Sequence, residues 1–327
     1  MNDMQKPREK LRAILEQTVG LAQAGQHGDA LALLERLAAD RELLEKGEPG
    51  PLTALGEPRK LHSTRLKLAK LRRDMREIAA LQYLLVPHPA VLADLATFHE
   101  GSRNAMTDIN RQPVPRVVHQ IWLGDLPLPP ATAAWQAHCK SHGFEWRLWR
   151  EADLARQGFD RHPSFQAMLA RGDYPGAVDV ARYLILSQQG GVYLDCDWYP
   201  ARDGASLADC HPLIGLSALP EDTPRLTGFG PLLLTNSFIA SPPGHLVFTR
   251  LLEAMPQAMA RLPDAPAWWS TGPLLFTLIL RSTTVTLPDC TLVAANLPRR
   301  APFSAVEEAR KQADRVARGF LIGWKSW

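Results

Sequence analysis

Two aspartates two positions apart, Asp195 and Asp197, directly follow the apolar run 192–194. Alternate residues of a strand face the same side, so both carboxylates are expected to enter one site at the carboxyl end of a strand. Neighbouring carboxylates repel each other unless a cation lies between them. Mg²⁺ and Mn²⁺ prefer such oxygen ligands, usually one or two carboxylates together with substrate phosphates. The spacing favours a metal–diphosphate site, and the alternative is a loop whose acids cap backbone N–H groups.

A second pair of charged residues, Asp179 and Arg182, lies in the segment before this strand. Residues three apart share a face of a helix, so the two side chains can form an ion pair. A pair on a solvated helix surface would contribute little. Here Ala181 and Tyr183 flank the arginine, and this apolar setting indicates a buried pair instead. Such a pair could hold sugar hydroxyls and a phosphate through forked hydrogen bonds.

These side chains require an α/β framework to position them. From about residue 113, short apolar runs bounded by Gly and Pro alternate with segments of helical periodicity. Strands alternating with helices predict a layered α/β domain with a largely parallel sheet. The expected strands lie in 113–124, 144–150, 190–200, 211–219 and 236–241, and the expected helices in 176–189 and 245–262.

The first hundred residues predict a different, all-helical domain over 1–108, built as a bundle or as helical hairpins. Apolar residues recur at helical spacing over 7–25, 29–47 and about 63–85. The last of these segments carries a basic face, which we interpret either as a solvated surface or as a docking site for an anionic membrane or an acidic protein. This face comprises Arg59, Lys60, Arg65, Lys67, Lys70, Arg72, Arg73 and Arg76.

The composition restricts the class of protein. The chain has 327 residues, of which 46% are hydrophobic and 22% charged, as in soluble globular proteins. Its net charge of +3 gives no global field for nucleic acid, so no nucleic-acid partner is expected. The four cysteines form no C-x-x-C pair, which favours a reducing compartment. We find no signal-peptide core and no run of the ~18 apolar residues that a membrane span needs, so a cytoplasmic location is expected.

Residues 176–199, GAVDVARYLILSQQGGVYLDCDWY, resemble the hallmark of the DXD-motif sugar-transferase superfamily. This superfamily includes the Och1-like α-glycosyltransferases (glycosyltransferase family 32) and the glucosylating domains of large clostridial toxins. Its pattern is S-D-x-x-R-Y followed by G-G-x-Y-x-D-x-D, and the usual Ser is Val178 here. Segments 115–124, 236–245 and 270–277 and the closing GWKSW resemble further family blocks in the expected order. The matching positions are Asp179, Arg182, Tyr183, Gly190, Gly191, Tyr193, Asp195 and Asp197.

The resemblance implies a GT-A-like (Rossmann-like) glycosyltransferase domain over 109–327. It implies transfer of a sugar, with retention, from a nucleoside diphosphate sugar to a glycan or protein acceptor. A UDP-sugar is the favoured donor, and a GDP-sugar is the alternative. The resemblance also implies Mn²⁺ or Mg²⁺ held by Asp195 and Asp197, a donor sugar held by Asp179 and Arg182, and Trp122 stacked on the base. The remaining donor-site residues that it implies are His119, Gln120, Ile121, Tyr193, Asn236, Ser326 and Trp327.

Other functions remain open at this level. One is an effector-type transferase, delivered into a host cell to modify a host protein, in contrast to a bacterial cytoplasmic enzyme for surface polysaccharide. Another is a phosphohydrolase of the haloacid-dehalogenase type. That chemistry requires the first Asp as nucleophile and usually Thr or Val after the pair, where Trp198 stands here. A third is a non-catalytic interaction protein, against which the intact acidic pair argues.

Overall fold

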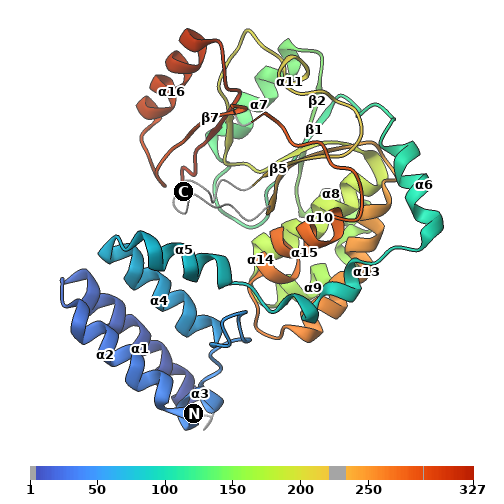
Figure 1. Ribbon diagram of the computed structural model, residues 1–327. Helices are drawn as coiled ribbons and strands as arrows, with labels where there is room; N and C mark the ends of the chain where they lie inside the picture. The colour runs from blue at the N-terminus through green and yellow to red at the C-terminus, as the bar shows by residue number, and fades with distance from the viewer. Residues whose placement is uncertain (1–4, 221–232, 290) are drawn as a thin grey trace. The chain divides into compact units, whose positions relative to one another are not determined.

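The computed structural model describes residues 5–220, 233–289 and 291–327, which divide into two compact units (Figure 1). The domain boundary expected between residues 1–108 and 109–327 stays a prediction. The helical unit comprises residues 5–94, 233 and 259–270, and the sheet unit comprises residues 95–220, 234–258 and 271–327 without 290.

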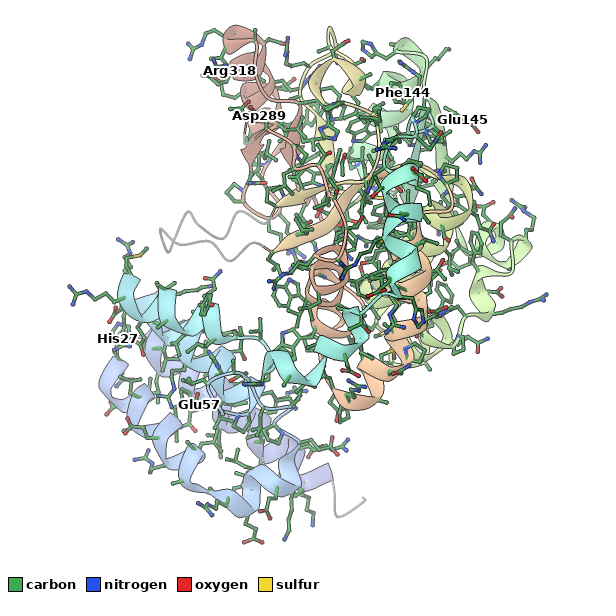
Figure 2. All side chains as sticks on the ribbon, turned by 45° about the vertical axis from the view of Figure 1, so that its right-hand side comes forward. His27, Glu57, Phe144, Glu145, Asp289 and Arg318 are labelled. Carbon is green, nitrogen blue, oxygen red and sulfur yellow. The ribbon has the colours of Figure 1, made fainter. Side chains whose placement is uncertain are left out.

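Amphipathic helices form most of the helical unit. Leu11, Leu34, Leu61 and Leu68 lie in its buried core, which joins helices far apart in the sequence. In Figure 2, Glu57 marks the loop before the fourth helix, where its carboxylate lies 2.8 Å from the Arg65 guanidinium. The helices and helical turns are α1 (Gln5–Gln23), α2 (His27–Ala39), α3 (Arg41–Gly47), α4 (Arg59–Arg72), α5 (Met75–Leu84), η1 (Pro89–Val91) and α14 (Ala267–Ser270).

The helix expected over 63–85 is wrong as a single element, because the chain breaks between α4 and α5. Arg73 takes a left-handed backbone with φ of 56°, which ends α4. The Asp74 side chain then accepts a hydrogen bond from the backbone N–H of Glu77 and caps α5. The break turns the expected apolar stripe, so that Leu71 and Met75 are 40% and 48% exposed.

Strands and helices alternate through the first part of the sheet unit, as the sequence predicts. Strands β1 (Val117–Ile121) and β2 (Glu145–Trp149) pair in parallel, and β3 (Gly191–Leu194) pairs in parallel on the other side of β1. This βαβ arrangement brings the carboxyl ends of three strands to one edge. The intervening helices and turns are α7 (Pro130–Ser141), α8 (Glu151–Arg156), η3 (Phe159–Arg161), α9 (Pro163–Ala170) and α10 (Tyr174–Gln189).

The expected α/β class is confirmed, but the sheet is mixed rather than largely parallel. Strand β6 (Leu234–Ser241) lies antiparallel to both β3 and β5 (Ser217–Pro220). Strand β4 (Trp198–Pro200) leaves this sheet and joins a second one in the order β4-β8-β7. The other elements are η2 (Ala93–Ala96), α6 (Glu100–Ile109), α11 (Leu207–Cys210), α13 (Leu246–Arg261), α15 (Pro273–Leu280), β7 (Val293–Asn296), α16 (Phe303–Val316) and β8 (Leu321–Gly323).

Two glycines connect α10 directly to β3. Gly190 has φ of 60°, and a Cβ there would lie 2.5 Å from the backbone N of Pro243. Gly191 has φ of 98°, and a Cβ there would lie 2.8 Å from the carbonyl oxygen of Val117. Only glycine fits such positive φ values and close backbone approaches without strain. The tight turn fixes the helix that carries Arg182 against the strand that precedes Asp195.

Within the described ranges, none of the helices combines the length and the apolar character that crossing a bilayer requires.

Candidate active site

A cavity of about 610 Å³ opens at the carboxyl ends of β1 and β3. Both aspartates of the Asp-x-Asp pair line it, as expected from their position after a strand. The Asp195 backbone N–H donates to the Ser237 carbonyl on β6, 2.9 Å away, so the loop is held as it leaves the sheet. Between the aspartates, the Cys196 thiol turns inward, with its sulfur 3.3 Å from the Ile121 carbonyl oxygen. This alternation directs both carboxylates to the cavity side.

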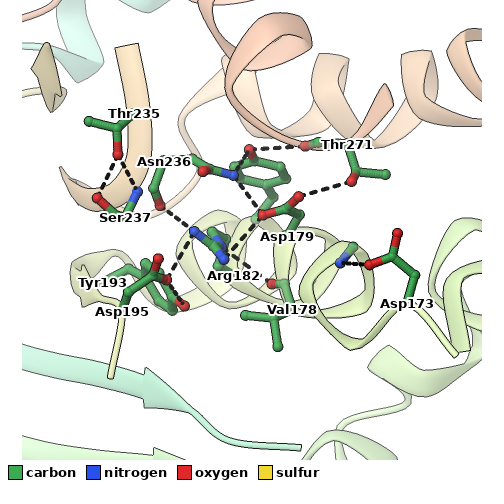
Figure 3. Close-up of polar contacts among 12 residues, drawn as sticks. Asp173, Val178, Asp179, Arg182, Tyr193, Asp195, Thr235, Asn236, Ser237 and Thr271 are labelled. Atoms are coloured by element: carbon green, nitrogen blue, oxygen red, sulfur yellow. Dashed lines mark hydrogen bonds and ion pairs between the residues drawn. The ribbon is translucent and has the colours of Figure 1, made fainter. Parts of the chain in front are cut away.

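Arg182 links α10 to the first carboxylate (Figure 3). Its guanidinium lies 3.2 Å from Asp195 Oδ1 and 3.1 Å from Asp179 Oδ1, and it also donates to the Asn236 carbonyl. The guanidinium carbon lies 4.4 Å from the centre of the Tyr193 ring, within range of a cation–π contact. Burial lowers the pKa of Arg182, but the facing acids and tyrosines outweigh it and raise the pKa overall. Arg182 is therefore a permanent, largely buried cation in the wall of the cavity.

Asp179 lies behind Arg182 and is only 6% exposed. Its Oδ1 also accepts from Asn236 Nδ2 at 2.7 Å, and its Oδ2 accepts from Thr271 Oγ1 at 2.9 Å (Figure 3). Burial raises the pKa of Asp179 to about 6, although Arg182 and these hydrogen bonds act in the opposite direction. With both oxygens occupied by the protein, Asp179 positions Arg182 and is not among the residues that line the cavity.

The C-terminal tail completes the wall of the cavity. The backbone N–H of Trp324 donates to the Asp197 carbonyl at 2.7 Å, next to the antiparallel pairing of β4 with β8. The pairing carries the tail to the aspartates. The ring of Trp327 then meets Trp122 edge to face, with ring centres 4.9 Å apart. Two aromatic side chains far apart in the sequence therefore stand together at one side of the cavity.

Most of the sequence-predicted site residues come together at this cavity. The residues that line it are Ile121, Trp122, Arg182, Tyr193, Asp195, Asp197 and Trp327. The predicted residues outside the lining are His119, Gln120, Asp179, Asn236 and Ser326.

His119 and Gln120 are fully buried in the core of the sheet. Trp149 Nε1 donates to His119 Nδ1 at 3.2 Å, so Nε2 carries the proton and donates to the Gly190 carbonyl at 3.0 Å. Burial lowers the pKa of His119 to about 4, which keeps the ring neutral. The Gln120 side-chain oxygen accepts from Trp146 Nε1 at 2.9 Å. Both side chains join neighbouring strands through these contacts, and direct nucleotide contact at the two positions stays a prediction.

Several residues at the site were missing from the sequence-based prediction. Tyr174 packs its ring on Gly124, where an added Cβ would lie 3.3 Å from the ring. Lys325 is exposed and enters the cavity through the C-terminal tail, whose match to a family block was the available signal. Thr271, which bonds Asp179, lies in another such block. The remaining lining residues outside the prediction are Leu123, Asp125, Leu126, Pro175, Val178 and Cys196.

The two aspartates suit a divalent cation by their chemistry. Burial and the neighbouring Asp195 carboxylate raise the pKa of Asp197, and a bound cation would relieve both effects. In the described parts of the chain, no three His, Cys, Asp or Glu side chains gather as a metal-binding group. Mg²⁺ commonly takes only one or two protein carboxylates, and phosphate and water oxygens would complete the coordination of an ion held by this pair.

Comparisons with known proteins give a family for this arrangement. The family described as "glycosyltransferase sugar-binding region containing DXD motif" matches residues 141–211, which include α10, β3 and the Asp-x-Asp pair. Over 173 residues, 51% of this chain, the sequence is 26% identical to the mannosyl phosphorylinositol ceramide synthase of Saccharomyces cerevisiae. The same identity and coverage relate it to inositol phosphoceramide mannosyltransferase 3 of Schizosaccharomyces pombe.

These matches cover 42% and 44% of the two fungal proteins, so the chain spans less than half the length of these relatives. A solved structure, the PaToxG glycosyltransferase, aligns with 64% of this chain and 79% of its own, with a TM-score of 0.43 and 15% identity. The family match falls on the helix, turn, strand and carboxylates that build the cavity, and it confirms the resemblance of this region to the DXD-motif sugar-transferase superfamily.

Proposed function

We propose that the chain is a metal-dependent glycosyltransferase that uses a nucleoside diphosphate sugar, with a UDP-sugar favoured and a GDP-sugar as the alternative. The observation that carries this proposal is the convergence of Asp195, Asp197, Arg182 and two indole rings on one cavity of about 610 Å³. The carboxylates supply a metal site, and Trp122 offers a surface on which a base can stack. A cavity of this size lies in the range of small-molecule sites, about 300–1,000 Å³.

In this proposal, bound Mn²⁺ or Mg²⁺ would neutralise the negative charge that develops on the departing diphosphate. Asp195 and Asp197 would hold the ion. Arg182 would orient Asp195 through their ion pair, and Asp179 would hold Arg182 in place. Tyr193 donates its hydroxyl to Asp195 Oδ1 at 2.7 Å and fixes the same carboxylate from the strand side. Transfer would proceed with retention of the anomeric configuration.

The acceptor belongs to the proposal as well. A glycan or a protein is the class expected from the sequence, and the names of both fungal relatives add an inositol phosphoceramide lipid. A mannosyl donor follows from the same names. A bacterial cytoplasmic enzyme and an effector acting on a host protein remain distinct versions of this proposal, separated by whether a purified glycan, lipid or protein accepts the sugar.

The test combines nucleotide binding with donor hydrolysis. UDP, GDP, ADP and CDP are titrated with Mn²⁺, with Mg²⁺ and with EDTA, and the thermal unfolding midpoint is recorded. One nucleoside diphosphate should raise this midpoint only in the presence of metal, by the linkage between binding and stability. The matching nucleotide sugars should then be hydrolysed in a metal-dependent way. Release of phosphate from simple phosphomonoesters without use of any nucleotide sugar would support the phosphohydrolase instead, and no binding of any nucleotide would contradict the transferase.

The basic face of the helical unit would hold the enzyme on an anionic bilayer that carries the acceptor. Lys67, Lys70, Arg73 and Arg76 are exposed on or next to α4 and α5. Arg72, by contrast, is paired with Glu77.

Each exposed basic residue near an anionic surface contributes ~1 kcal/mol, so reversal of these four to Glu should weaken vesicle binding by more than about 100-fold. Co-sedimentation with vesicles of phosphatidylcholine and phosphatidylserine measures this loss. The matched control reverses exposed Lys6, Lys10, Arg36 and Arg41, which changes the net charge equally. Equal losses in both variants would leave no role for this particular face.

A further inference from the structure

Two basic residues lie among the described residues that line the cavity, Arg182 and Lys325. They differ in how much of their hydrogen-bonding capacity is already used. Arg182 meets Asp179, Asp195 and the carbonyls of Asn236 and Val178. It is 4% exposed. Such a guanidinium has little capacity left for a ligand.

Lys325, by contrast, has most of its hydrogen-bonding capacity left for a ligand. It is exposed, and within the described residues no carboxylate lies within the 4.0 Å of an ion pair with its ammonium. It nevertheless stands close to the acids. It lines the same cavity as Asp195 and Asp197, and the backbone N–H of the residue before it donates to the Asp197 carbonyl. Its Nζ lies 5.3 Å from the centre of the Trp327 ring, so the cation stands beside the aromatic wall of this cavity.

The backbone around Lys325 is fixed on both sides. Its own carbonyl accepts from the Arg300 N–H at 2.7 Å, and the preceding Trp324 N–H is bound to the Asp197 carbonyl. After it, Arg299 Nε donates to the Trp327 carbonyl at 2.9 Å. The position of this residue beside the Asp-x-Asp loop is therefore built into the fold, although its side chain remains free to reach a ligand.

We propose that Lys325 binds the diphosphate of the donor and stabilises it as the leaving group, an assignment that rests on the proposed function. Transfer breaks the bond between the sugar C1 and the β-phosphate oxygen, and the electron pair of this bond stays on that oxygen. C1 forms its new bond to the acceptor oxygen, whose proton is released to the departing phosphate or to water. The diphosphate carries two negative charges before this step and a third afterwards, above its last pKa of about 6.

The Lys325 ammonium is mobile and has three N–H donors. It suits this change of charge better than the Arg182 guanidinium, whose donors are already bonded to protein groups. The charges of the Asp195 and Asp197 carboxylates cancel the two positive charges of one divalent ion, so the ion leaves the charge of the diphosphate uncompensated. A further positive charge is therefore needed to hold a diphosphate that gains charge as it departs. Lys325 supplies that charge from the same cavity.

The test compares affinities for the diphosphate, the monophosphate and the free nucleoside of the base that the parent protein binds, by calorimetry with Mn²⁺ and with EDTA. Lys325→Met keeps the length of the side chain and removes the charge. It should weaken binding of the diphosphate about 10-fold and that of the nucleoside less than about 2-fold, because only the phosphates meet a cation. Lys325→Arg should retain the diphosphate affinity within about 3-fold. Lys140→Met, an exposed lysine on α7 outside the cavity, is the matched control and should change nothing.

A merely structural role of Lys325, as compensation for the two acids, has a different signature. Lys325→Met would then lower the unfolding midpoint of the ligand-free protein and leave the ratio of diphosphate to monophosphate affinity as in the parent. That unchanged ratio would overturn the assignment of Lys325 while the proposed function stands. A parent protein that binds no nucleoside diphosphate, with or without metal, would overturn the proposed function itself and this assignment with it.

Discussion

Replacing Asp197 by Ala should reduce sugar transfer on the order of 10³-fold, because one of the two carboxylates proposed to hold the metal is lost. The fold should survive this change. Burial raises the pKa of Asp197, as does Asp195, so the ionised carboxylate opposes folding at pH values above the ordinary pKa of an aspartate. In metal-free protein at pH 8, the unfolding midpoint of the variant should therefore equal or exceed that of the parent. Donor turnover and thermal unfolding with and without Mn²⁺ plus nucleotide measure both effects.

Asp203 provides the control for this prediction. It is an exposed aspartate after the same segment, and its carboxylate pairs with Arg310 on the surface. Asp203→Ala should retain transfer and the full stabilisation by metal and nucleotide, since exposed ion pairs contribute little. An Asp197→Ala protein that keeps the metal-dependent stabilisation would remove Asp197 from the metal site.

Of the substitutions proposed for this protein, Arg182→Met should cause the largest loss of unfolding free energy. The substitution leaves the buried Asp179 carboxylate with hydrogen bonds from Asn236 and Thr271 but without its counter-ion. Removal of one partner of a buried ion pair costs about 3–5 kcal/mol of unfolding free energy. Arg156→Met is the control, because Arg156 is 72% exposed and pairs with Asp153 at the surface. The control should change the unfolding free energy by less than about 1 kcal/mol in denaturant melts.

The loss caused by Arg182→Met should depend on pH in one direction. Burial already raises the pKa of Asp179 to about 6 in the parent, and loss of the cation raises it further. A carboxyl whose pKa is raised by folding stabilises the folded state below its unfolded pKa and loses that contribution as the pH rises. The variant should therefore be closer to the parent at pH 5 than at pH 8. Adding Asp179→Asn should restore part of the lost stability, and absence of both effects would contradict a buried, charged pair.

The division between the two units shows where local sequence patterns reach their limit. The periodicity of residues 7–25 and 29–47 predicts the helices of the helical unit, because an amphipathic pattern depends on neighbouring residues. The same reasoning gives no hint that residues 259–270 belong to this unit. There, the Arg59 guanidinium lies 5.7 Å from the centre of the Trp269 ring. A shortened chain that starts near residue 110 would lack this contact, so the experiments above use the full chain.

The sequence by itself determined the order of helix α10, the glycine turn, strand β3 and the Asp-x-Asp pair. These features depend on local rules: helical spacing places Asp179 near Arg182, and glycine permits the positive φ values of the turn. The resemblance to the sugar-transferase family followed from the same residues. The parallel pairing of β1 with β2 and β3 was also accessible, because strands joined through helices form such sheets.

Only the tertiary structure decided which side chains face the cavity. It placed His119 and Gln120 in the core, occupied both oxygens of Asp179 with protein donors, and brought Lys325 and Trp327 to the aspartates. The reason is that β8 pairs with β4 across a long stretch of chain, and β6 pairs antiparallel with β3. Such pairings are selected by the burial and hydrogen bonding of the whole domain, against the entropy of closing long loops, and no local pattern of residues encodes them.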